Sequence, residues 1–396
     1  MNVTAAQRTG TGPWRRVTAR VRRFVRGMTV LNRFVSRAGR SRRVWAIASA
    51  AIAMCGGFAG SARAQGVSLP PVTIGAGIRT DFTHTEPDSG DSTDRFNLDN
   101  ARLYINGSVT RNIKVMFNTD YSSVSDDLQI LDAVGRFEFS PKFNVWMGRF
   151  LPPSDRANLY GPFYAHHWAV YTDGVQDGYP FVYQGRDNGV MYWGQFGKAK
   201  LSGGVFDGPS ATPHNDNVIS AGRIQVDLWD PEDGYYLNGS YYGDKNLLAL
   251  GVAGQVQAAD GTGDAGKAVN ADFLLERKVG MGGAYTVEAE WARYDELGGY
   301  DPRYRVDNGG YVLGSYLFPT LTGQGRFEVL AKYAYAKFSE GLTRVNPDYH
   351  QKTTELNLNY IIKQFDARVM IFYKDTRFNA VKADDKQVGV GLQLQM

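Results

Sequence analysis

Apolar and polar residues alternate strictly in segment after segment of this chain, from about residue 72 to the C-terminus. Leu103 and Ile105 fall on one face of an extended segment, and Arg102 and Tyr104 fall on the other. Successive side chains of a β-strand point to opposite faces, so a period of two predicts strands with one apolar and one wet face. Connections rich in Gly, Asp, Asn and Pro separate these segments. The chain is therefore predicted to be all-β.

Alternation alone does not decide the environment of the strands, because a soluble β-sandwich shows the same period. Helical periodicity is almost absent, and the strands are long enough to cross a bilayer at a tilt. Aromatic residues gather at strand ends, as membrane interfaces favour; examples are Phe137, Phe139, Tyr235 and Tyr236. The polar faces carry charge in strand after strand, which suits a water-filled lumen. We predict a transmembrane antiparallel β-barrel, with a sandwich or solenoid as the alternative.

The segments do not give an even strand count, although single-chain bacterial barrels normally have one. Either two short segments between Tyr235 and Lys278 form one element, or a strand is hidden between Leu151 and Asp187. We predict sixteen strands, with eighteen as the second choice. A barrel of that size encloses an aqueous channel. In the closing strand we expect Leu392 to face lipid and Gln393 to face water.

The first 64 residues have a different composition from the rest of the chain. They contain thirteen Arg and no Lys, Asp or Glu, which leaves 31 basic against 40 acidic residues in the remainder. The basic charge therefore belongs to the leader, and a nucleic-acid partner is not predicted. An apolar run from Val44 to Phe58 precedes the small-residue site Ala62-Arg63-Ala64.

This layout predicts a secretory signal peptide over residues 1–64, with a long basic n-region and cleavage after Ala64. A twin-arginine signal at Arg42-Arg43 is an alternative, and Met28 is a second candidate for the start codon beside Met1. The barrel then occupies residues 65–396. We expect export to the outer membrane of a Gram-negative cell, where the barrel contacts lipid.

A stretch from Leu151 to Asp187 shows no clean alternation. A structureless loop of this length in a compact barrel is usually functional. We expect it to fold into the lumen and narrow the pore; the alternative is an exposed loop with solvated charges. Its candidate selectivity charges are Arg149, Asp155, Arg156, Asp173, Asp177, Arg186 and Asp187.

Charged side chains of both signs fall on the predicted inner faces. The predicted basic wall consists of Arg102, Lys114, Arg136, Arg223, Lys332, Arg368 and Lys374. The acidic residues include Asp120, Asp132, Glu138, Asp227, Glu288, Glu290 and Glu355. A basic wall steers anions if the carboxylates cluster elsewhere, because the local field decides selectivity more than the net charge. The alternative is that these charges pair across the wall and only order the water.

Patterns typical of catalysis are weak. The five histidines are His84, His166, His167, His214 and His350, all in or beside predicted loops. His166 and His167 are adjacent, so an extended backbone places their rings on opposite sides, which suits neither a metal site nor a base with its orienting partner. We predict no enzyme, no cofactor and no metal site. A barrel enzyme is a less favoured alternative, and a structural or adhesive barrel without an open pore is another.

One segment carries a resemblance to a known family. Residues 144–153, Asn-Val-Trp-Met-Gly-Arg-Phe-Leu-Pro-Pro, are followed by Asp155-Arg156, and a second pattern covers residues 241–252. These segments and the close of the chain resemble the phosphate-selective porin O and P family. Leu151 stands where that family often has Lys, and Met396 stands where barrels of this class commonly end in an aromatic residue.

The resemblance implies a trimeric, sixteen-stranded outer-membrane channel whose basic lumen residues attract phosphate or other anions. Together with the residue patterns, it predicts a porin for passive diffusion of small hydrophilic solutes, with a preference for anions. Small anionic or polar solutes and two further copies of the chain are the expected partners.

Overall fold

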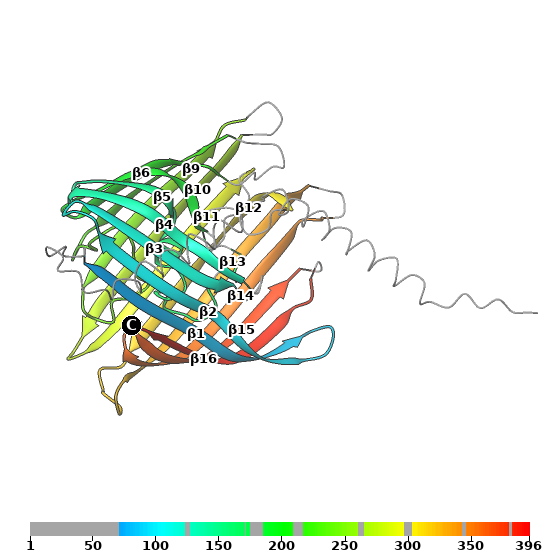
Figure 1. Ribbon diagram of the computed structural model, residues 1–396. Coiled ribbons are helices and arrows are strands. Elements are labelled where there is room, and N and C mark those ends of the chain that lie inside the picture. Colours follow the sequence, from blue (N-terminus) through cyan, green and yellow to red (C-terminus); the bar gives the residue numbers. More distant parts are fainter. Residues whose placement is uncertain are drawn as a thin grey trace, which may run out of the picture. The chain divides into compact units, whose positions relative to one another are not determined.

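The computed structural model is a closed antiparallel β-barrel of sixteen strands, in which β1 pairs with both β2 and β16 (Figure 1). It describes residues 71–122, 127–170, 172–174, 185–208, 217–259, 265–296, 303–342, 346–379 and 382–396. The predicted signal peptide and its cleavage after Ala64 lie outside these residues. No helix among them is long and apolar enough to cross a membrane. The predicted fold class and strand count are confirmed.

Every strand pairs with its neighbours in the sequence, so the barrel is an uninterrupted meander. The strands are β1 (Val72–Pro87), β2 (Thr93–Ser108), β3 (Ile113–Ser122), β4 (Asp127–Ser140), β5 (Phe143–Phe150), β6 (Asp187–Phe196), β7 (Ala199–Phe206), β8 (Ile219–Asp227), β9 (Leu247–Gln257), β10 (Gly266–Val279), β11 (Gly283–Asp295), β12 (Tyr304–Leu317), β13 (Arg326–Gly341), β14 (Tyr349–Lys363), β15 (Ala367–Phe378) and β16 (Asp385–Gln395). Meander connectivity leaves each strand with two antiparallel partners, so closure removes every sheet edge.

The strands direct apolar side chains outward and polar side chains inward, as the alternation predicts. On β16, Leu392 is 36% exposed on the outer face, whereas its neighbour Gln393 is 0% exposed. Gln393 differs from our expectation in one respect, because it does not face open water. Its Nε2 donates a hydrogen bond to the carbonyl oxygen of Phe163 at 2.9 Å, so a segment inside the barrel covers it.

The two ends of the barrel have connections of different kinds. The turn end holds both termini of the barrel and tight connections such as residues 109–112 and 141–142. The loop end holds the connection between β5 and β6, residues 151–186, which we call the inward loop. A second long connection, residues 228–246 between β8 and β9, enters from the turn end, and we call it the turn-end insert.

The turn-end insert accounts for the surplus strand segment in the sequence. The segment that begins near Tyr235 is not a strand, although its neighbour β9 is one. Tyr235 and Tyr236 do not lie at a membrane interface either. Tyr235 is 6% exposed and belongs to an apolar cluster with Trp146 and Leu159 inside the barrel. Buried rings in a segment without regular secondary structure give the same sequence pattern as the end of a short strand. The prediction of an extra strand and the prediction of interfacial tyrosines were both wrong for this reason.

Candidate functional site

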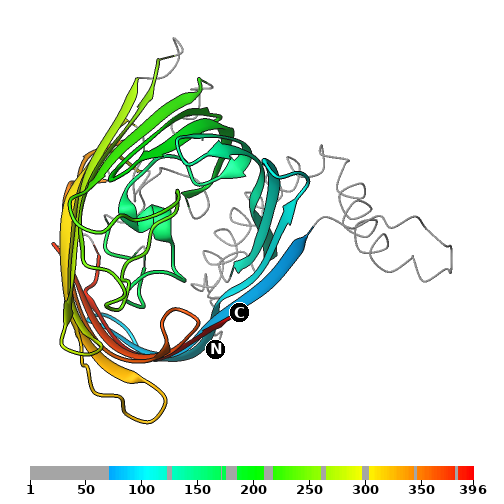
Figure 2. The same ribbon diagram turned by 90° about the vertical axis from the view of Figure 1, so that its left-hand side faces the viewer.

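The inward loop lies inside the barrel, where Figure 2 shows its short helix α3 (Arg156–Tyr160) within the ring of strands. Three arginines on separate strands hold the loop by its backbone. Arg223 on β8 donates to the carbonyl of Ser154 at 3.1 Å, and Arg368 on β15 donates to that of Ala165 at 2.7 Å. Arg79 on β1 donates to the carbonyl of Trp168 at 2.7 Å. The loop therefore spans the lumen from one wall to the other, as the sequence predicts.

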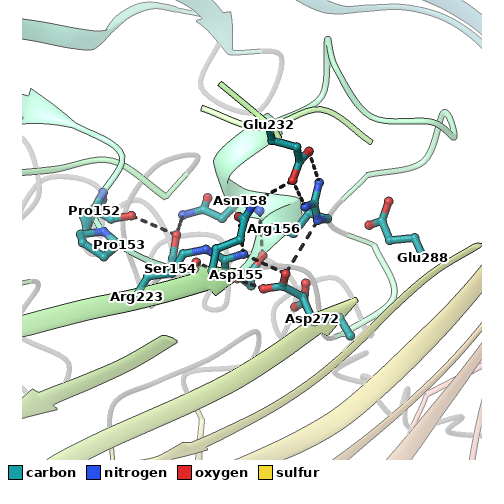
Figure 3. Close-up of polar contacts among 12 residues, drawn as sticks. Pro152, Pro153, Ser154, Asp155, Arg156, Asn158, Arg223, Glu232, Asp272 and Glu288 are labelled. Carbon is teal, nitrogen blue, oxygen red and sulfur yellow. Dashed lines mark hydrogen bonds and ion pairs between the residues drawn. The ribbon is translucent and has the colours of Figure 1, made fainter. Parts of the chain in front are cut away.

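Helix α3 presents Arg156 to two buried carboxylates, those of Glu232 and of Asp272 on β10 (Figure 3). Asp155 caps the helix, since its side chain accepts a hydrogen bond from the backbone N–H of Asn158 at 2.7 Å. Arg156 is 0% exposed and donates hydrogen bonds to both carboxylate oxygens of Glu232. The hydrogen bond to Oε1 is 2.9 Å long. Its Nε lies 3.7 Å from Asp272. A buried arginine needs such partners, because an unpaired charge is costly in a dry interior.

Glu232 belongs to the turn-end insert, so this ion pair joins segments that enter from opposite ends of the barrel. Burial alone would raise the pKa of Glu232, but the charge and hydrogen bonds of Arg156, together with Lys200 and Tyr241, outweigh burial and lower this pKa to about 2. Two further hydrogen bonds join the inward loop and the turn-end insert. The backbone N–H of Gly239 donates to the carbonyl of Tyr164 at 2.9 Å, and the hydroxyl of Tyr235 donates to the carbonyl of Leu151 at 2.9 Å. The two segments form one packed unit across the lumen.

The inward loop covers much of the acidic side of the lumen. Glu288 on β11 accepts a hydrogen bond from the Tyr160 hydroxyl at 2.8 Å. His166 lies 2.7 Å from Glu328 on β13. Burial opposes protonation, but the charge and hydrogen bond of Glu328, together with the charges of Glu276 and Glu288, outweigh burial and raise the pKa of His166. Asp173 of the loop forms an ion pair with Lys332 at 2.5 Å. These carboxylates serve to hold the loop rather than to line open water.

A cavity of about 660 Å³ remains between the two inserted segments and strands β2–β4. It extends from Met396 at the turn end to Arg186 at the end of the inward loop. Arg102, Arg136 and Arg186 line it. Arg102 pairs with Asp120 at 2.9 Å, and Arg186 lies 3.4 Å from Asp132. The cavity therefore concentrates guanidinium groups on the side of the lumen opposite the covered carboxylates.

Most of the residues predicted to carry lumen charge lie on the inner face of the wall or inside the barrel. Arg102, Lys114, Arg136, Arg223, Lys332, Arg368 and Lys374 all lie on the inner face of the wall. Asp155, Arg156, Asp173 and Arg186 lie inside the barrel on the inward loop, and Asp187 is the first residue of β6. Asp177 lies outside the described residues. Arg223 and Arg368 bind loop carbonyls instead of facing a channel, which the sequence did not indicate.

Arg149 was expected at the constriction, and this placement is wrong. It lies on the outer face of β5 together with Met147, which is 64% exposed. Its Nε donates to the carbonyl of Ile130 on the neighbouring strand at 3.2 Å. Phe150 is fully buried inside, and a strand period of two then requires Arg149 to point outward.

Sequence reasoning missed Glu232 and the turn-end insert as a whole. The insert begins Asp230-Pro231-Glu232-Asp233-Gly234, which reads as an ordinary turn. The signal available was the lack of a clean alternation between β8 and β9, the same signal that identified the inward loop. It was masked by Tyr235 and Tyr236, which imitate the end of a strand.

Comparison with known proteins supports the fold. No protein-family model matches the sequence, and no curated protein is similar to it. OprB of Pseudomonas putida has a similar structure, with a TM-score of 0.57 and 8% identity over 82% of this chain and 94% of that one. The outer membrane channel DcaP of Acinetobacter baumannii has a TM-score of 0.54 and 14% identity, covering 84% and 99%. A trimer form of OmpT, an outer membrane protein of Vibrio cholerae, has a TM-score of 0.50 and 12% identity, covering 83% and 100%.

These similarities establish that the chain has the barrel fold of outer-membrane proteins. They do not extend to the phosphate-selective family that the segment at 144–153 resembles.

Asp155 offers a test of how the inward loop is held. Burial raises the pKa of its carboxyl to about 7 from an ordinary value of 3.8. The packed loop therefore retains a proton that the open loop releases, so packing weakens as the pH rises from about 4 to about 7. The variant Asp155→Asn keeps a good helix cap and removes the titration. We expect protease cleavage of the loop in the folded barrel to increase between about pH 4 and 7, and less so in the variant. Equal pH dependence in both proteins would contradict this origin.

Proposed function

We propose that this chain is a porin-like channel, rather than an enzyme, that passes small hydrophilic solutes by passive diffusion. The observation that carries the proposal is the cavity lined by Arg102, Arg136 and Arg186 within a closed barrel of apolar outer and polar inner face. A barrel of sixteen strands encloses more space than its own side chains fill, so it holds water unless other segments occupy it. The inserted segments leave part of that space open along β2–β4.

We infer a moderate preference for anions, because basic and acidic side chains lie on different sides of the lumen. Guanidinium groups line the cavity, while carboxylates such as Glu288 and Glu328 are occupied by the inward loop. Low-dielectric walls concentrate the field of fixed charges in a narrow passage. Arg102 and Arg186 are themselves paired with carboxylates, and Leu151 supplies no additional cation. Weak attraction of anions in general is therefore proposed, without a tight phosphate site.

The same proposal includes location and assembly. The outer face of the barrel wall is predominantly apolar, as contact with lipid requires, and the basic leader suits export to a Gram-negative outer membrane. A homotrimer is proposed by analogy with the trimer form of OmpT. Cross-linking of the native membrane protein would test the trimer.

The test of the channel is conductance in planar lipid bilayers. Replacing Arg136 and Arg186 with glutamine removes two cations from the cavity lining, so the anion-to-cation permeability ratio should fall by about tenfold. The zero-current potential in a salt gradient measures this ratio. Arg149→Gln is the matched control, because Arg149 faces outward, and its reversal potential should equal that of the wild type. A conducting double variant with unchanged selectivity would show that these arginines do not set it.

A second candidate function is a structural barrel without an open pore. The observation that favours it is the packed unit of inward loop and turn-end insert, which crosses the lumen at Arg156 and Glu232. A wild-type protein that inserts into bilayers without any conductance would support this candidate and refute the channel.

A further inference from the structure

A second cavity, of about 580 Å³, opens at the turn end of the barrel. Its lining includes Trp146, Trp193 and Tyr235 together with Tyr236, Lys114 and Arg136. Residues of two tight turns, Asn112 and Pro141, also reach its rim. Its volume lies within the range of small-molecule sites and far exceeds that of an inorganic ion.

Four of the lining residues form one aromatic cluster. The ring of Trp146 lies 5.2 Å from that of Tyr235, 5.6 Å from Tyr236 and 5.9 Å from Trp193, measured between centroids. Trp146 is 2% exposed and Trp193 is 9% exposed, so the cluster is packed firmly against the wall. The Arg136 guanidinium lies over Trp146 at 5.5 Å. A rigid aromatic wall offers a surface on which a flat apolar group is removed from water.

Several polar atoms at this cavity lack partners, although the Tyr235 hydroxyl donates to the carbonyl of Leu151. Among the described residues, the indole Nε1 of Trp146, the indole Nε1 of Trp193, the hydroxyl of Tyr236 and the Nε of Arg136 are buried without a hydrogen bond. Buried polar groups are normally paired, and each exception calls for an explanation. The two indole nitrogens and the Arg136 Nε act only as hydrogen-bond donors, and the Tyr236 hydroxyl can also donate. Their complement is therefore a ligand rich in acceptor atoms.

The charges beside the aromatic cluster also favour a ligand rich in acceptor atoms. Arg136 and Lys114 face the cavity, as does Glu138, which pairs with Lys114 at 2.6 Å and lies 3.7 Å from Arg136. Asp233 also lines the cavity but lies 3.5 Å from Lys245, a cation outside the lining. Basic groups therefore exceed the carboxylates available to them. An acceptor-rich ligand here is favoured if it carries negative charge.

We propose that this cavity binds an organic anion with a flat apolar body, of which an aryl carboxylate is the simplest example. The carboxylate pairs with the guanidinium of Arg136 and the ring packs against Trp146 and Tyr236, whose buried unpaired donors come within reach of the carboxylate when these side chains shift on binding. The site lies at the turn end, where both termini of a bacterial barrel face the periplasm. The idea that a transported solute binds at this site on its way through the channel rests on the proposed channel function. The binding of the anion itself does not depend on that function.

Binding is measured on the detergent-solubilised full barrel with 4-fluorobenzoate as the probe, by ¹⁹F NMR line broadening and by calorimetry. We expect saturable binding of 4-fluorobenzoate. The neutral analogue 4-fluorobenzyl alcohol lacks the charge, and inorganic phosphate lacks the ring, so both should bind at least about tenfold more weakly. Binding of the alcohol equal to that of the carboxylate would overturn the anionic class, and equal binding of phosphate would overturn the need for a ring.

Variants locate the site. Trp146→Phe keeps an aromatic ring but removes one donor, and Arg136→Gln removes the charge; each should weaken binding about tenfold. Trp291→Phe is the matched control, because Trp291 is 47% exposed on the outer face of β11, and binding should be unchanged. If no probe saturates, or if both cavity variants bind as the wild type does, the proposal is wrong. Conductance measured on the same samples is a separate readout, so failure of the channel proposal remains distinguishable.

Discussion

Replacing Arg156 with leucine is expected to increase single-channel conductance and its fluctuations. Arg156 is fully buried and is the main charged link between the inward loop and the turn-end insert. Removing one member of a buried ion pair costs about 3–5 kcal/mol, because the remaining charge stays in a dry site without its partner. The carboxylate of Glu232 would then favour hydration, whereas Asp272 keeps its ion pair with Arg223, and the two segments should separate where Arg156 and Glu232 now meet.

The partner variants make this expectation specific. Glu232→Leu alone should also raise conductance, because it removes the main partner of Arg156 and leaves only the more distant Asp272. The double variant Arg156→Leu/Glu232→Leu removes both charges, and replacement of a buried pair by apolar residues is often close to neutral. Its conductance should therefore return toward the wild-type level. Heat-modifiable migration in detergent gels reports that each barrel has folded. A folded Arg156→Leu barrel with wild-type conductance would show that the ion pair does not hold the lumen closed.

The barrel itself was predictable because its wall obeys one simple rule. A strand that separates lipid from water must alternate, so Leu103 and Arg102 reveal their faces in the sequence alone. The same rule identified the closing strand and the inner position of the basic wall. It also contained the correct position of Arg149, since counting by twos from the apolar Val145 and Met147 places Arg149 on the same outer face.

The contents of the lumen were less predictable, because they depend on contacts between residues far apart in the chain. Arg156 and Glu232 are 76 residues apart, and Arg368 lies 203 residues from the Ala165 carbonyl that it binds. No local pattern indicates which carboxylate or carbonyl an inward arginine reaches. An inner arginine that binds a loop carbonyl and one that faces water have the same place in the alternation. The length of the inward loop indicated that it is functional, but its partners required the three-dimensional structure.

A charge on the outer face should be far less tolerated than the same charge on the inner face of the same strand. Leu103 lies near the middle of β2 and is 39% exposed on the outer face. Asn106 lies further along β2 on the inner face and lines the cavity of about 660 Å³. The variant Leu103→Lys should destabilise the membrane-inserted barrel by about 2–4 kcal/mol, because a lysine near the bilayer midplane loses its hydration.

Asn106→Lys is the matched control, because its ammonium group enters a polar cavity that already contains Arg102 and Arg136. Its cost should be small, with only modest repulsion from these cations. Urea titration of the barrel in lipid vesicles, followed by tryptophan fluorescence, measures both free energies of unfolding. The comparison also separates the two environments that the alternation implies. Equal destabilisation by both lysines would mean that the outer face of β2 does not contact lipid, since a water-exposed Leu103 accepts a lysine at almost no cost.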